Sequence, residues 1–253
     1  MLITSAPADP VHSAITAALA DDLSIAVRVG LQPPYTWTVA TSTGQLQGAG
    51  PGFIEELPRR RRLVLVGATD LAAAVAAMAE PLHRRVVVLD PRPGHATSGA
   101  FPSTSTVVRA WPDEWISRHP LDAHDAVVIL SHDPRIDDPA IRAALVGNVG
   151  HIAVLGSRAT HAQRLRRLAA TAGIDRLSGP AGLDLGGISP AETALSILAE
   201  LVAVENGRSG RRLRDGDLPI HVSTTPAHAP RVEQPPSTVM PLPWITVGRK
   251  RPR

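Results

Sequence analysis

Cysteine is absent from the 253-residue chain, and that absence excludes several kinds of site at once. Disulfides, thiolate metal sites and cysteine nucleophiles cannot form without it. Aromatic side chains are scarce too, with two Phe, one Tyr and four Trp. The apolar share of 43% is nevertheless ordinary for a globular protein. The core must therefore be packed mainly from Ala, Val and Leu.

Lysine is almost missing, because Lys250 is the only one and arginine supplies the rest of the positive charge. The net charge is only +3, and the arginine clusters Arg59–Arg62, Arg211–Arg214 and Arg249–Arg253 have no aromatic residues between them. This pattern indicates solvated linkers and argues against nucleic-acid binding. No basic-then-apolar leader and no run of about 18 apolar residues occurs, so we expect a cytoplasmic protein without stable membrane insertion.

The chain divides into three regions by composition. Residues 1–57 predict a small β-rich region, with a short helix at Val11–Ala20 and breakers such as Pro33-Pro34. Regular periodicity spans residues 62–207. Residues 208–253 are rich in proline and arginine, which predicts a flexible C-terminal tail.

Residues 62–207 alternate short apolar runs with helical patterns, as an α/β domain does. Fully apolar, β-branched runs are typical of parallel strands covered on both faces. We therefore predict a Rossmann-like, three-layer domain with an open, mostly parallel sheet. The expected strands are Leu63–Val66, Arg85–Leu89, Thr106–Arg109, Asp125–Leu130 and His151–Leu155. The expected helices are Asp70–Glu80, Pro139–Val146, Thr160–Ala172 and Pro190–Asn206.

The first strand-to-helix turn retains only part of the dinucleotide-binding pattern. Gly67 occupies the first glycine place, but Thr69 fills the second and Asp70 adds a negative charge at the helix start. Because an acidic group there repels phosphate, the turn disfavours ordinary NAD binding. Asp90 ends the second strand, where either a ribose-binding acid or a turn-capping carboxylate fits.

The densest polar cluster follows the fourth strand, with Ser131, His132 and Asp133 leading to Asp137 and Asp138. The group could hold a divalent metal or bind a polar ligand, although the spacing is not that of a helical zinc motif. Helix capping accounts for Asp138 before Pro139. It does not account for His132 and Asp133, which we expect to face the site.

Two further loops follow strands or precede helices. The turn Gly156-Ser157-Arg158-Ala159-Thr160 reads equally well as an anion cradle at a helix start and as a plain turn capped by Ser157. The loop Gly182–Gly187 holds Asp184 between glycines that permit positive φ. It is either a structural loop or one in which Asp184 accepts hydrogen bonds from a ligand.

Taken together, these segments resemble the XdhC/CoxI family, accessory proteins of xanthine dehydrogenase and related molybdenum hydroxylases. The resemblance spans Glu56 to His221 and rests on many short motifs in one order. They are Arg62–Ala68, Val88–Pro93, Ser131–Pro134 with Asp137, Gly156–Arg158 with Thr160, Pro180–Gly186, Ser189–Ala194 and Ile197–Glu200.

The resemblance implies a carrier of molybdenum cofactor rather than an enzyme. Members protect the cofactor, support its sulfuration by a cysteine desulfurase, and deliver it to the hydroxylase apoenzyme, often as homodimers. Arg158 and the neighbouring amides would hold the phosphate of the cofactor, and acceptors on other loops would bind its pterin. The expected cofactor-binding residues are Gly67, Asp90, Arg92, His132, Asp133, Gly156, Ser157, Arg158, Thr160, Gly182 and Asp184, with no catalytic or metal-binding residue.

The chain also departs from the family's usual pattern. Thr69 and Asp70 replace the last two residues of a Gly-Ala-Gly-His turn, and Ser178 stands near where the family often has a histidine. Two alternatives therefore stay open. One is a Rossmann-type NAD(P)-dependent oxidoreductase, which an NADH titration would reveal. The other is an interaction module of the same family that has lost its ligand.

Overall fold

The chain divides into two compact units in a computed structural model. The structure describes residues 9–20, 23–33, 35–46, 50–217, 219–220 and 231–232. One unit comprises residues 1–59 and 221–253, and the other comprises residues 60–220. Each has its own sheet and its own apolar core. Within the described ranges, no helix is both long and apolar enough to cross a membrane.

The first unit is a small antiparallel sheet with one helix. Its strands follow the order β10-β3-β1-β2, and side chains of β1, β2 and β3 form a core with the helix. The elements are α1 (Asp9–Ala20), β1 (Ile25–Gly30), β2 (Trp37–Ala40), β3 (Gly52–Leu57) and β10 (Arg231–Val232), with a 3₁₀ turn at Thr43–Gln45.

The second unit is built on six parallel strands in the order β6-β5-β4-β7-β8-β9. They are β4 (Arg62–Val66), β5 (Arg85–Leu89), β6 (Thr106–Val108), β7 (Ala126–Ile129), β8 (His151–Val154) and β9 (Leu177–Ser178). Counted within the unit, this is the order 3-2-1-4-5-6 of a dinucleotide-binding fold, and it reverses between β4 and β7.

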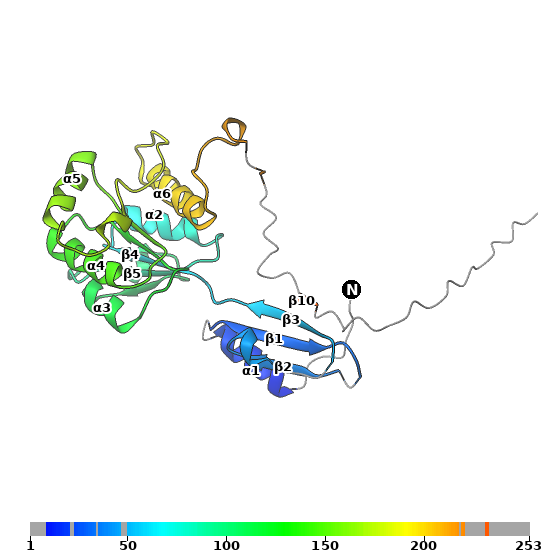
Figure 1. Cartoon of the computed structure of the whole chain (residues 1–253). Helices are drawn as coiled ribbons and strands as arrows, with labels where there is room; N and C mark the ends of the chain where they lie inside the picture. The colour runs from blue at the N-terminus through cyan, green and yellow to red at the C-terminus, as the bar shows by residue number, and fades with distance from the viewer. Residues whose placement is uncertain are drawn as a thin grey trace, which may run out of the picture. The chain divides into compact units, whose positions relative to one another are not determined.

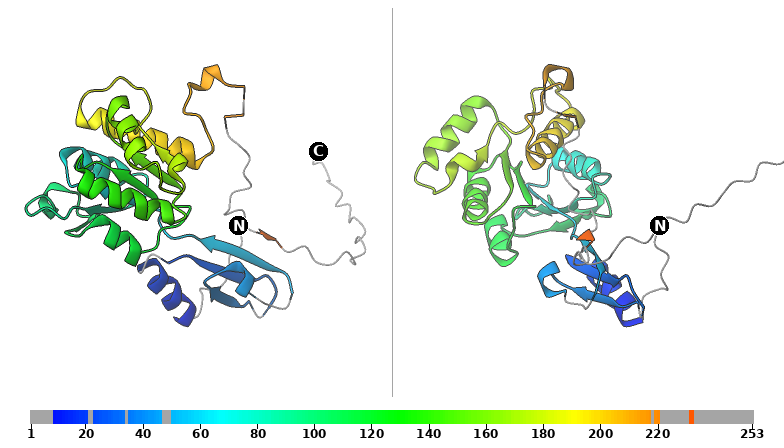
Figure 2. Two further views of the ribbon diagram at one scale, coloured as in Figure 1. Left: turned by 60° about the vertical axis from the view of Figure 1, so that its left-hand side comes forward. Right: turned by 45° about the vertical axis from the view of Figure 1, so that its right-hand side comes forward.

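Helices cover both faces of this sheet (Figure 1), and a second direction shows the same three layers (Figure 2). Alternate residues of β4 explain why, because Leu63 and Leu65 pack towards α2 and α6 while Val64 and Val66 pack towards α3 and α4. The helices are α2 (Asp70–Ala79), α3 (Pro112–Arg118), α4 (Pro134–Val146), α5 (Arg158–Arg167) and α6 (Pro190–Glu205). Short 3₁₀ turns lie at Ser98–Ala100, Ile174–Arg176 and Leu213–Asp215.

The predicted fold class is confirmed, but the start of α4 was placed too late. The helix begins at Pro134, where Asp133 caps it by accepting a hydrogen bond from the backbone N–H of Arg135 at 3.0 Å. Pro139 lies inside the helix. Asp138 is therefore not the cap, and its carboxylate instead pairs with Arg167 of α5 at 2.6 Å.

Other differences concern short elements. The seven-residue α3 and the two-residue β9 were not predicted, and α5 ends at Arg167 instead of continuing to Ala172. Strand β10 pairs with β3 from within the segment predicted as a flexible tail. Neither β9 nor β10 has enough residues to show an alternating pattern in sequence.

Candidate ligand site at the carboxyl edge of the sheet

The loops after β4 and β7 touch at the point where the strand order reverses. Gly67 has φ +103, and a Cβ added to it would lie 2.7 Å from the Cα of Ser131. Only glycine accommodates both the conformation and this close approach. In open α/β sheets, ligands bind in the crevice at this switch point.

Asp90 is a fully buried carboxylate that organises the neighbouring loop. It accepts hydrogen bonds from the backbone N–H of Ala68 at 2.8 Å, the backbone N–H of Arg92 at 2.9 Å, and the Arg92 guanidinium at 2.9 and 2.7 Å. Burial disfavours its charged form, but these donors together lower the pKa of Asp90. Four hydrogen bonds use about all the acceptor sites of a carboxylate, so Asp90 positions Arg92 and the first turn.

In the loop after β7, His132 is exposed and Asp133 is half-buried. His132 has φ +61, an uncommon conformation for a side chain of this size, and is exposed. Asp133 combines its capping bond with an ion pair to the exposed Arg135, at 2.8 Å. The Arg135 side chain and backbone N–H lower the pKa of Asp133 to about 2. Asp133 is thus a helix cap that is still reachable from solvent.

A buried polar chain runs beneath this loop to α5. The Ser131 hydroxyl donates to Asp137 at 2.5 Å, and the Arg164 guanidinium lies 3.5 Å from both the Asp137 carboxylate and the Leu155 carbonyl. Burial raises the pKa of Asp137 and lowers the pKa of Arg164. These buried polar side chains connect the loop after β7 to the loop after β8.

The turn after β8 is a capped helix start. Gly156 has φ +146, and Ser157 accepts a hydrogen bond from the backbone N–H of Thr160 at 3.1 Å. The hydroxyls of Ser157 and Thr160 lie 2.9 Å apart. Arg158 is the first residue of α5 and is exposed. Capping and an anion cradle are compatible here, because the cap leaves Arg158 open to solvent.

The loop after β9 is anchored to α6 through Glu200. This carboxylate accepts hydrogen bonds from the Ser178 hydroxyl and the Gly182 backbone N–H, both at 2.7 Å, and lies 3.8 Å from Nε2 of His151. Burial opposes ionisation, yet these partners lower the pKa of Glu200 to about 2. Asp184, farther along the loop, is exposed.

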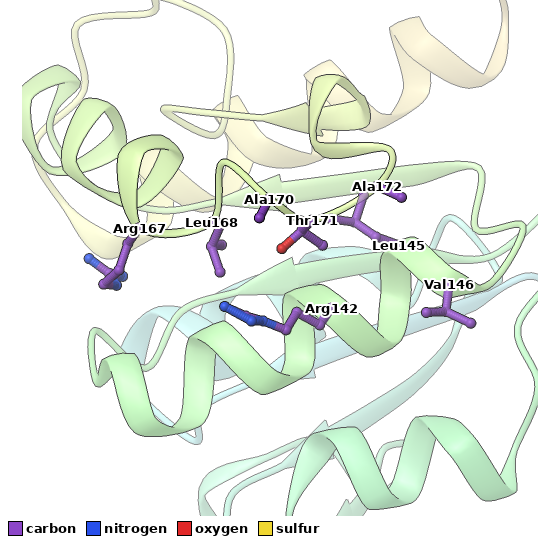
Figure 3. A pocket seen from close by; sticks show the side chains of 8 residues that line it. All are labelled: Arg142, Leu145, Val146, Arg167, Leu168, Ala170, Thr171 and Ala172. Atoms are coloured by element: carbon purple, nitrogen blue, oxygen red, sulfur yellow. The ribbon is translucent and has the colours of Figure 1, made fainter.

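Two of the hollows in the described part of the second unit differ in their position relative to the site. The larger, about 570 Å³, lies between α4 and the end of α5, with Arg142 and Arg167 at its walls (Figure 3). None of the predicted site residues lines it. The smaller, about 230 Å³, lies at the carboxyl edge. Its lining is Pro91, Arg92, Pro93, Trp111, Asp133, Arg135 and Ile136.

The structure therefore brings the predicted residues together in groups. Arg92 and Asp133 both line the smaller hollow. Gly156 lies next to Arg164, which connects through Asp137 to Ser131. In the described part of the chain, no hydrogen bond joins Asp184 to the other predicted residues. Within the same part, no group of three His, Cys, Asp or Glu side chains is placed to hold a metal ion.

Four residues beside the site were not predicted from sequence: Trp111, Arg135, Arg164 and Glu200. Trp111 precedes a helix that was itself missed. Arg164 is one of three arginines near the end of α5, and only the packing shows that it alone is buried. Glu200 was part of a recognised motif, but its hydrogen bonds to a distant loop leave no local signal in the sequence.

Comparison with known proteins agrees with this geometry. The family model for the XdhC Rossmann domain matches residues 63–201, more than half of the chain. A protein of Bacillus subtilis, named as a probable xanthine dehydrogenase subunit, is 31% identical over 159 residues, 59% of this chain and 44% of that protein. An uncharacterised protein of Escherichia coli, YqeB, is 29% identical over 167 residues, 64% of this chain and 31% of that protein. The chain thus spans less than half the length of these curated relatives.

A solved structure shows the same fold. The crystal structure described as a xanthine dehydrogenase from Bacillus halodurans superposes with a TM-score of 0.62 at 19% sequence identity. The match covers 81% of this chain and 65% of that one. With the strand order, the carboxyl-edge loops and the match over residues 63–201, the chain belongs to the XdhC family.

Proposed function

We propose that this chain is an accessory protein of a xanthine dehydrogenase-type molybdenum hydroxylase and that it binds molybdenum cofactor. The observation that carries the proposal is the carboxyl edge of an XdhC-type sheet, where exposed arginine and carboxylate groups surround glycine turns. The name of the Bacillus subtilis relative supports the link to xanthine dehydrogenase. Sulfuration by a cysteine desulfurase, transfer to the apoenzyme and a homodimeric state complete the proposal.

The side chains at this edge suit the groups of the cofactor. The backbone N–H groups at the start of α5 and the exposed Arg158 provide donors for a phosphate. His132, Asp133 and Asp184 provide acceptors for the amino and ring N–H groups of a pterin, and none of the three is buried. The bound cofactor would bring the molybdenum centre on which the client hydroxylase depends.

The rival NAD-binding function meets two obstacles at the first turn. Asp90 already accepts four hydrogen bonds, so it offers no free acceptor site to a ribose diol. One of those bonds uses the Ala68 N–H, in the turn that faces the pyrophosphate in dinucleotide sites. These contacts favour the carrier function over the oxidoreductase.

The direct test is retention of pterin. The purified chain is incubated with molybdenum cofactor, separated by gel filtration, and assayed for pterin fluorescence after oxidation, with an NADH titration beside it. We expect stoichiometric retention of pterin and no binding of NADH. The same elution profile reports whether the chain is a dimer. Absence of retained pterin would contradict the proposal.

Arg158→Ala should weaken cofactor retention at least about tenfold, because a charge-assisted hydrogen bond contributes roughly 1.5–3 kcal/mol. The matched control is Arg166→Ala, which removes an equally exposed arginine from the same helix, a little over two turns on. We expect the control to bind as the parent chain does. Equal affinity of all three proteins at unchanged thermal stability would exclude Arg158 from the site.

A second candidate function is contact with a protein partner alone. It is favoured by three exposed apolar side chains on the Gly182 loop and the start of α6, namely Leu185 (52% exposed), Ile188 (94%) and Leu195 (53%). Ile188→Glu should leave pterin retention unchanged and reduce activation of a xanthine dehydrogenase apoenzyme. If the parent chain activates the apoenzyme without retaining pterin, this second function replaces the first.

A further inference from the structure

Arg164 is a buried cation whose charge is only partly compensated. Its side chain is 4% exposed, and its Nη2 lies 3.5 Å from the Asp137 carboxylate and from the Leu155 carbonyl, at the long end of the hydrogen-bond range. Its Nε and Nη1 are buried with no hydrogen-bond partner among the described residues. Unsatisfied donors on a buried charge are costly, so a native protein that keeps them usually has a ligand, ion or water to supply the acceptor.

The unpartnered Nη1 of Arg164 lies next to the turn that starts α5. A Cβ built on Gly156 would lie 3.8 Å from this Nη1 and 3.4 Å from Cβ and Cγ2 of Thr160. The Ser157 and Thr160 hydroxyls, 2.9 Å apart, lie at the same turn. The first N–H groups of the ten-residue α5 begin there as well. Hydroxyl, backbone N–H and guanidinium donors therefore all belong to this one turn or lie next to it.

We propose that Arg164 is the charged floor of a site for a tetrahedral oxyanion of the phosphate-monoester class at the start of α5. The anion enters between Gly156 and Thr160, accepts hydrogen bonds from Nη1 and Nε, and takes the place of the Ser157–Thr160 hydroxyl contact. The inference rests on the proposed function in assigning the phosphate of the cofactor to this turn. It differs in making the buried Arg164, rather than the exposed Arg158, the main counter-charge.

A substitution at Asp137 can distinguish an anion-binding Arg164 from an Arg164 with a purely structural role. Its carboxylate competes with a bound anion for the same guanidinium, and Ser131 holds it in place at 2.5 Å. Asp137→Asn removes that competing charge and should strengthen anion binding. A guanidinium that merely neutralises Asp137 would give no such gain.

The experiment uses the full-length chain and inorganic phosphate, measured by titration calorimetry with chloride at matched ionic strength as the reference. We expect saturable phosphate binding, weakened at least about tenfold by Arg164→Gln and unaffected by Arg166→Gln. Asp137→Asn should bind phosphate more tightly than the parent chain. A parent chain that does not bind phosphate, or a folded Arg164→Gln variant that binds it normally, would overturn the inference.

Loss of Arg164 alone leaves the Asp137 carboxylate buried without a cation and can unfold the chain. The double variant Asp137→Asn/Arg164→Gln removes both charges and is compared with Asp137→Asn. Phosphate binding of equal strength in these two proteins overturns the inference even if the single variant does not fold.

A second arm separates this site from the proposed function. Phosphate binding that depends on Arg164, without pterin retention, would support the oxyanion site and contradict the carrier function. Pterin retention that is unchanged by Arg164→Gln in either background would support the carrier and contradict the oxyanion site.

Discussion

Two buried carboxylates, Asp90 and Asp137, and the half-buried Glu200 each hold one loop of the site, and their electrostatic balance differs. For Asp90 and Glu200, burial opposes ionisation but the hydrogen bonds outweigh it and lower the pKa. For Asp137, burial outweighs the Ser131 bond and the Arg164 charge, and the pKa is raised. The difference follows from the number of close donors, because Asp90 accepts four hydrogen bonds and Glu200 two at 2.7 Å, whereas Asp137 accepts one from Ser131 and Arg164 stands at 3.5 Å. Asp137 is therefore the carboxylate whose partner is most easily shared with a ligand.

Glu200→Gln should lower the free energy of unfolding at neutral pH. The pKa of Glu200 falls from 4.5 to about 2 in the folded chain, and each pKa unit is worth about 1.4 kcal/mol, so the loss is on the order of 3–4 kcal/mol. Because the folded pKa is depressed, this stability is present above about pH 4.5 and disappears as the pH falls towards 2. Denaturant unfolding at pH 7, 4 and 2.5 measures the difference between the two proteins.

The difference between parent and variant should therefore be largest at pH 7 and shrink at acid pH. Glu114→Gln is the control, because Glu114 forms an exposed pair with Arg118 on α3 and such pairs contribute little. A Glu200→Gln variant as stable as the parent chain at pH 7 would show that Glu200 does not anchor the Gly182 loop.

At the scale of elements, the turn from β4 to α2 is constrained by close packing against the loop after β7. Gly67→Ala would combine a positive φ with a Cβ 2.7 Å from the Ser131 backbone, which cannot move without displacing β7. We expect a loss of roughly 2–4 kcal/mol of unfolding free energy. Gly94→Ala is the matched control, because Gly94 also has positive φ but nothing lies within 4 Å of its added Cβ. Thermal unfolding with equal losses in both variants would refute the packing argument.

The regular elements were largely predictable from the sequence because each strand of the large sheet is a continuous apolar run. Burial on both faces makes such runs obvious, as in Leu63–Val66 and His151–Val154. Capping chemistry identified the start of α6, where Ser189 and Glu192 form the expected capping box. The same chemistry misplaced α4, because Asp133-Pro134 and Asp138-Pro139 offer two equivalent starts and only the ion pair of Asp138 with Arg167 decides between them.

The site was predictable as a set of loops but not as a set of contacts. Parallel topology places the end of every strand at one edge, so Gly67, Asp90 and His132 could be grouped from sequence alone. The sequence did not show which of these side chains are buried or already hydrogen-bonded within the protein. Asp90 proved to be saturated by Arg92, two residues further on, together with Ala68, 22 residues away in sequence. Arg164 proved to be buried beside Asp137, 27 residues away.

At the scale of the whole molecule, the second unit carries every residue to which a function is assigned. Its two apolar cores lie on opposite faces of one sheet, so neither depends on residues outside 60–220. Its first strand is fixed by Arg62, which bonds to the buried Asp125 at 2.8 Å. The end of α6 is fixed by Glu205, whose carboxylate pairs with Arg61 at 3.0 Å and with Arg84. Ion pairs within the second unit therefore hold both its first strand and its last helix in place.

A chain limited to residues 60–220 should therefore fold alone and unfold in one cooperative transition. Self-contained cores of this size are typical of independent domains. It should retain pterin and phosphate as the full-length chain does, because the loops after β4, β5, β7, β8 and β9 all lie within it. Circular dichroism during heating measures the transition, and calorimetry measures the phosphate affinity. A cooperative fold with lost binding would mean that residues 1–59 or 221–253 complete the site, whereas a broad, non-cooperative transition would mean that they complete the core.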